Sequence, residues 1–189
     1  MIRARRNSHI WERKRAFRSD RDGAVSVEFA LLMAPFALLL QGIIEVGMIL
    51  YADASLQHAT DAAARLIRTG QVTNRAGTII MNIDTFIGRL CSEATILKDC
   101  DTNISIDVRA ANSFDALSSS MPDPLTVGPD EPGGNPDRDF SPGGSRKATS
   151  IIVTYDWSLG LAAIMPLGNV QEGSAMRLQA ITVFRSEPY

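Results

Sequence analysis

The sequence is short of the residues that catalysis and metal binding use. Its 189 residues include two histidines, His9 and His58, and two cysteines. It lacks the G-x-S-x-G motif of a serine nucleophile and a glycine-rich phosphate loop. A structural zinc site needs four ligands, more than one stretch of this chain offers. We therefore expect no enzyme, no bound metal and no cofactor.

Basic residues are densest in the N-terminal segment, and the rest of the chain is short of net positive charge. Residues 1–23 hold eight basic and three acidic side chains, a net charge of +5, whereas the other residues hold 11 basic and 18 acidic ones, a net charge of −7. A basic segment directly before an apolar one is a topology signal and a contact for anionic lipid. We therefore expect no nucleic-acid partner.

Residues 24–50 form an apolar run interrupted by only three strongly polar residues, Glu28, Gln41 and Glu45. About 20 apolar residues cross a bilayer as a helix. The run therefore predicts one transmembrane helix over 24–50, with 1–23 as a cytoplasmic leader and the C-terminal part outside. The alternative is a cleaved signal peptide, but the run exceeds the usual apolar core of about 7–15 residues.

The helical pattern continues over 51–70 as an amphipathic extension. Apolar and small residues recur there every three or four positions, a spacing typical of a helix that packs on a neighbour. This helix-packing seam consists of Ile49, Ala52, Leu56, Ala59, Ala63 and Leu66. It either packs on the chain's own outer domain or contacts another subunit, and the spacing leaves both alternatives open. Gly70 is the expected C-cap.

Residues 71–189 predict a small α+β domain outside the membrane. Apolar residues at helical spacing indicate a second helix over about 78–97, with a possible break near Gly88. Three segments alternate between apolar and polar residues, which predicts about three antiparallel strands. These segments are 103–109, 149–157 and 176–184.

Two stretches of this domain have other compositions. Residues 118–147 are rich in proline, glycine and aspartate without the spacing of a calcium loop, so we expect a flexible loop. Residues 159–168 are apolar without a clear period and form either a buried turn or an apolar surface on a membrane or partner.

The two cysteines, Cys91 and Cys100, lie nine residues apart in the part expected to be exported. An oxidising compartment favours their pairing as a disulfide. Closing so small a loop contributes about 2–3 kcal/mol in the chain-entropy treatment.

Two carboxylates in the apolar run need an explanation, because a charge in hydrocarbon costs about 2.5–3.5 kcal/mol on insertion scales. If the chain is cut between Gly23 and Ala24, the new α-amino group and Glu28 lie one helical turn apart and can pair. Glu45 either reaches the outer headgroup region or makes a polar contact with another span.

A basic leader that ends in Gly23 and is followed by four small or apolar residues, Glu28, Phe29 and a long apolar helix resembles the substrates of prepilin peptidases. The stretch from "GAVSVEFALL" onward is similar to the TadE/TadF-like family of tight-adherence (Flp-type) pilus assembly proteins. The resemblance implies a non-catalytic, minor pilin-like protein (a pseudopilin) of the bacterial inner membrane and periplasm. Gly23, Ala24, Glu28 and Phe29 form its expected processing motif.

The expected partners are the membrane, a prepilin peptidase, other pilin-like subunits and inner-membrane pilus assembly proteins. The expected fold is α+β: a single N-terminal transmembrane helix, its amphipathic extension, and a small periplasmic domain over 71–189. An alternative function is an unprocessed single-pass periplasmic binding or sensor module.

Overall fold

The structure, a computed structural model, describes residues 22–128, 138–164, 166–170 and 173–188. Most of the predicted leader and the middle of the predicted loop over 118–147 lie outside these residues. The chain divides into two compact units, Met1–Ile44 and Glu45–Tyr189. In its described part the first unit is helical, and the second is an α+β domain.

Helix α2 (Asp22–Arg68) belongs to both units, so the predicted span and its extension are parts of one helix. The helix ends where Gly70 adopts a φ of 78°, a conformation that costs glycine little. The Gly70 N–H donates to the Ile67 carbonyl at 3.1 Å, and the Gln71 N–H donates to the Leu66 carbonyl at 2.9 Å. These two bonds satisfy carbonyls that the helix end leaves open, so the predicted C-cap at Gly70 is confirmed.

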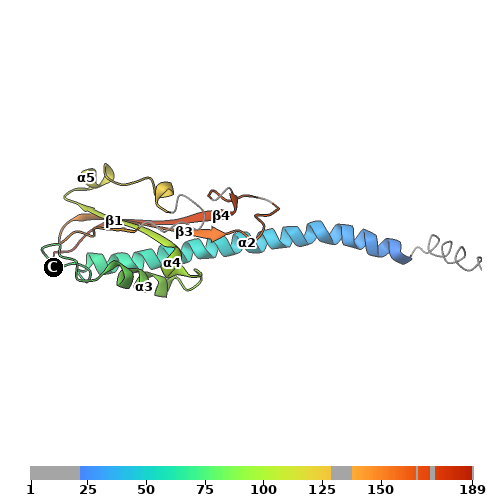
Figure 1. Cartoon of the computed structure of the whole chain (residues 1–189), viewed down its shortest axis with the longest axis horizontal. Helices are drawn as coiled ribbons and strands as arrows, with labels where there is room; N and C mark the ends of the chain where they lie inside the picture. Colours follow the sequence, from blue (N-terminus) through green and yellow to red (C-terminus); the bar gives the residue numbers. More distant parts are fainter. Residues whose placement is uncertain (1–21, 129–137, 165, 171–172, 189) are drawn as a thin grey trace, which may run out of the picture. The chain divides into compact units, whose positions relative to one another are not determined.

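Within the described residues the sheet has four strands in the order β2-β1-β3-β4, and Figure 1 shows its three long members side by side. The strands are β1 (Ile104–Ala111), β2 (Arg138–Phe140), β3 (Ala148–Ser158) and β4 (Ala175–Arg185). Strand β3 pairs antiparallel with β1 and with β4, as the alternating segments predict.

The predicted number of strands and their purely antiparallel direction are wrong, because β2 adds a fourth strand that pairs parallel with β1. Non-local contacts hold this short strand. The Ser141 N–H donates to the Val108 carbonyl at 2.7 Å, and the Phe140 ring lies 5.1 Å from the Phe86 ring, centroid to centroid. The Arg138 guanidinium donates to the Asp101 carbonyl at 2.6 Å.

Helices cover both faces of this sheet (Figure 1). The part of α2 that begins at Glu45 and helix α3 (Ile83–Glu93) lie on one face, where apolar side chains of all three long strands form the main core. Helix α5 (Phe114–Ser118) and the 3-10 turn η1 (Pro124–Thr126) lie on the other. The short helix α4 (Cys100–Asn103) leads directly into β1.

Helix α3 is shorter than the predicted 78–97 at both ends and continues through Gly88 without a break. It begins at Ile83 because the Asn82 side chain caps it, accepting from the Thr85 N–H at 2.9 Å. The preceding residues are extended instead, and the Ile80 N–H donates to the Val72 carbonyl at 2.8 Å.

Candidate functional site

The first unit presents an apolar helix surface on all sides. Every large apolar side chain from Val25 to Ile44 is at least 40% exposed. Among the described residues, one helix is long and apolar enough to cross a membrane, and it is α2. A helix that is apolar all round requires lipid or other helices around it.

The expected processing motif lies among the first described residues of α2. Gly23 and Ala24 belong to this helix, and Glu28 follows Ala24 by four residues. The side chains of Glu28 and Phe29 are exposed, Phe29 by 62%.

Glu45 makes a contact that the sequence did not indicate. Its carboxylate accepts a hydrogen bond from the backbone N–H of Gly160, which lies 115 positions further along the chain. Gly160 belongs to the connection between β3 and β4. The Glu45 carboxylate thus has a hydrogen-bond partner within its own chain.

The connection between β3 and β4 exposes apolar side chains at its tip. Ile164 is 63% exposed and Leu167 is 72% exposed, while Leu161 and Ala162 are partly buried. The sequence left a buried turn and an apolar surface as alternatives for 159–168. The described residues of the connection form an apolar surface.

The helix-packing seam of α2 faces the inside of the second unit. Ala52, Leu56 and Ala59 are fully buried, and Ala63 is 2% exposed. The seam's two outer members, Ile49 and Leu66, are partly buried against the same core. The small side chains allow α2 to approach the sheet closely. These residues therefore serve the chain's own domain, the first of the two alternatives.

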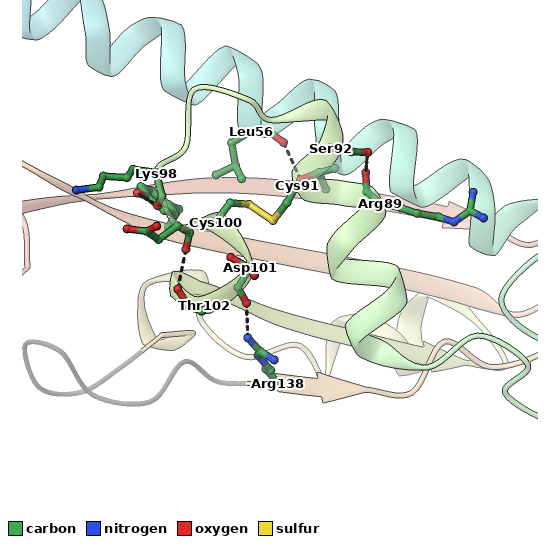
Figure 2. Close-up of a disulfide and its surroundings, with 12 residues drawn as sticks. Leu56, Arg89, Cys91, Ser92, Lys98, Cys100, Asp101, Thr102 and Arg138 are labelled. Atoms are coloured by element: carbon green, nitrogen blue, oxygen red, sulfur yellow. Dashed lines mark hydrogen bonds between the residues drawn. A yellow bond between two sulfur atoms is a disulfide. The ribbon is translucent and has the colours of Figure 1, made fainter.

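Cys91 of α3 and Cys100 of α4 form a disulfide with a Cα–Cα distance of 5.8 Å, so their predicted pairing is confirmed. Figure 2 shows the bridge near α2, and Cys100 belongs to the same buried cluster as Leu56. The bridge joins α3 to the residues that lead into β1. The figure also shows Arg138 of β2 donating to the Asp101 carbonyl, next to the bridge.

A polar site lies on the other face of the sheet, around Arg109 of β1. Its guanidinium donates to the Asp107 carboxylate at 2.7 Å and to the Ser120 carbonyl at 2.8 Å. The hydrogen bond with Asp107 raises the pKa of Arg109 above its usual value. Asp139 lies 3.5 Å away and adds a second negative charge. Asp107, Arg109 and Asp139 line a cavity of about 370 Å³, which also reaches Arg138.

A similar arrangement is found at β4, around Arg177. Its guanidinium donates to the Asp156 carboxylate at 2.7 Å and to the Leu125 carbonyl at 3.0 Å. The Arg177 side chain is 5% exposed and that of Asp156 is 13% exposed. The two arginines together hold the segment with α5 and η1 against the sheet. The alternation of polar residues along the strands placed them on this face, but no pattern in the sequence indicated what they hold.

Within the described part of the chain, no group of three or more histidine, cysteine, aspartate or glutamate side chains is placed to hold a metal ion. His58 lies on α2 and is exposed.

In the comparison with protein families, residues 23–65 match the family described as TadE-like protein. The match covers the processing motif, the apolar part of α2 and most of the seam, and it confirms the family resemblance over these residues. No curated protein and no solved structure matches the chain.

Proposed function

We propose that this chain, which is TadE-like over residues 23–65, is a membrane-anchored, minor pilin-like protein for assembly of a tight-adherence pilus. The observation that carries the proposal is the difference in side-chain exposure between the two halves of α2. From Val25 to Ile44 the helix exposes its apolar side chains, and from Ala52 it buries them in a folded domain. One helix that is both anchor and core element is what a pilin-like subunit requires.

The chain crosses the bacterial inner membrane once, with its N-terminus in the cytoplasm and its α+β domain in the periplasm. The net charge of +5 in residues 1–23 supports this orientation, since basic segments stay on the cytoplasmic side. The disulfide supports it independently, because disulfides persist in the oxidising periplasm and are rare in the cytoplasm.

A prepilin peptidase cuts the chain between Gly23 and Ala24. The cut releases the basic leader and leaves Ala24 as the new N-terminus, one helical turn before Glu28. The new amine and this carboxylate then neutralise each other, within one chain or between neighbouring subunits, which lowers the cost of holding Glu28 in an apolar environment.

The apolar half of α2, from Val25 to Ile44, makes the contacts with other pilin-like subunits and with inner-membrane assembly proteins. The seam residues, such as Ala52 and Leu56, are not available for such contacts, because the chain's own domain buries them. Among the described residues, the large apolar side chains between Val25 and Ile44 are exposed. The periplasmic domain acts in assembly without catalysis.

N-terminal sequencing tests the proposal. The full chain is expressed with and without its prepilin peptidase and recovered from membranes. We expect Ala24 as the first residue only in the presence of the peptidase, and loss of the cut in the Gly23→Arg variant. An intact Met1 in cells that contain active peptidase and cut a known prepilin would refute processing.

The cavity beside Arg109 favours a second candidate function. Charged side chains of Arg109, Arg138 and Asp139 line it, and its volume of about 370 Å³ admits a small polar ligand. An unprocessed single-pass periplasmic binding or sensor module would use such a cavity. The same sequencing experiment distinguishes the two functions, because this module keeps its leader.

A further inference from the structure

We propose that the connection between β3 and β4 is a second membrane contact, which inserts Ile164 and Leu167 into the interface of the leaflet on the side of the domain. The inference rests on the proposed function only in that α2 crosses the bilayer. The partner of the apolar connection is the lipid itself, at the boundary between headgroups and acyl chains.

The position along α2 at which the connection is attached supports lipid as its partner. The 21 residues 24–44 span about 31 Å as a helix, close to the ~30 Å thickness of the hydrocarbon core. A helix that enters the core at Ala24 therefore leaves it near Glu45. Gly160 of the connection donates its N–H to this carboxylate. The hydrogen bond thus holds the connection at the membrane boundary.

The side chains around this level are those that membrane interfaces favour. Val46, Met48 and Leu50 of α2 are still exposed, by 42% or more. Tyr51 follows at 61% exposure, and tyrosine is enriched where its apolar ring meets lipid and its hydroxyl meets water. The bond between Glu45 and Gly160 thus brings this part of α2 and the connection together at one end of the domain. Figure 1 shows β3 running into the connection at this end.

The chemistry of the connection around Ile164 and Leu167 also fits insertion. No residue from Leu159 to Val170 carries a charge, and the one charged residue of the connection, Glu172, follows this stretch. Several of its described backbone groups pair within the connection. The Ile164 N–H donates to the Leu161 carbonyl at 2.9 Å, and the Gly168 N–H donates to the Gly173 carbonyl at 3.0 Å. Paired backbone groups are what an apolar environment demands.

Depth-dependent fluorescence quenching tests the inference in the full chain. Both native cysteines are in the disulfide, so a new cysteine is the single site for a thiol-reactive, environment-sensitive dye. The variants Ile164→Cys and Leu167→Cys are labelled and reconstituted in phosphatidylcholine vesicles that carry lipids with a nitroxide near the headgroup.

Ile80→Cys is the matched control, because Ile80 is also an isoleucine with 63% exposure. The Ile80 N–H donates to the carbonyl of Val72, which follows the C-terminal end of α2. This end of the helix is opposite to Glu45, so we expect Ile80 to be in water. Leu39→Cys, within the apolar half of α2, reports whether the helix is in the membrane.

We expect a blue-shifted emission and several-fold stronger quenching at positions 164 and 167 than at position 80. Quenching at 39 with values at 164 and 167 equal to those at 80 would overturn the membrane contact and leave the proposed anchor intact. Loss of quenching at 39 as well would overturn both.

Discussion

Truncating Leu56 tests whether the outer half of α2 is a core element of the domain. Leu56 is fully buried, and Leu56→Ala removes three carbon atoms from the main core. The transfer of these atoms accounts for about 2.4 kcal/mol at ~0.8 kcal/mol per methylene group. The cavity that remains raises the expected loss in free energy of unfolding to about 3–5 kcal/mol.

Leu50→Ala is the matched control for this substitution. Leu50 belongs to the same helix but is 64% exposed, so the same truncation leaves no cavity in the core. We expect its effect on the free energy of unfolding to stay within about 0.5 kcal/mol.

Urea unfolding of the full chain in detergent micelles measures both variants. The chain has two tryptophans, Trp11 and Trp157, so a Trp11→Phe background leaves Trp157 of β3 as the reporter of the domain. Trp157 pairs with Met176 of β4 and is partly buried, so its emission responds to loss of the sheet. Equal free energies of unfolding for the Leu56 and Leu50 variants would refute the assignment of the seam to the domain core.

Three further predictions concern the disulfide and the polar contacts of the sheet. Replacing both Cys91 and Cys100 by serine lowers the free energy of unfolding by about 2–3 kcal/mol, and a reductant that destabilises this double variant as much as the native chain would contradict the prediction. Burial raises the pKa of Tyr155 above 10.0, so its contribution to stability is present below about pH 10 and is lost as the pH rises further; in Tyr155→Phe, a pH titration of the unfolding free energy should show a smaller loss in that range. Arg177→Met leaves the largely buried Asp156 carboxylate without its guanidinium and costs about 3–5 kcal/mol in urea unfolding, whereas adding Asp156→Asn recovers part of the loss; a double variant with the sum of the two single effects would exclude coupling.

Local periodicity was sufficient for the long elements of the fold. The three- and four-residue spacing of the α2 seam and the alternation in the segments of β1, β3 and β4 each report one buried face of one element. Such patterns are properties of neighbouring residues. They therefore predict these elements without knowledge of their partners, although the partner of the seam stayed open until the structure placed it.

The features that the sequence did not indicate depend on residues far apart in the chain. Strand β2 has three residues, too few for a pattern, and contacts such as that between Arg138 and Asp101 hold it in place. The bond between Glu45 and Gly160 joins a helix to a loop across 115 positions. Helix α3 begins late because Asn82 caps it, while the apolar spacing continues upstream of the cap. Apolar spacing alone does not mark where a helix begins.

Strand β4 contacts α2 but follows it at a long distance in the sequence, which sets the order in which the domain can be completed. The Thr182 hydroxyl of β4 donates to the Asp61 carboxylate of α2, and the two residues are 121 positions apart. At ~5–20 residues per second, synthesis of this interval takes roughly 6–24 s. During that time the core face of α2, with Leu56 and the seam alanines, has been synthesised but β4 has not, so this strand cannot yet cover it. A newly made chain therefore has two apolar helix surfaces, the half of α2 from Val25 to Ile44 and the seam. The folded domain later buries only the seam.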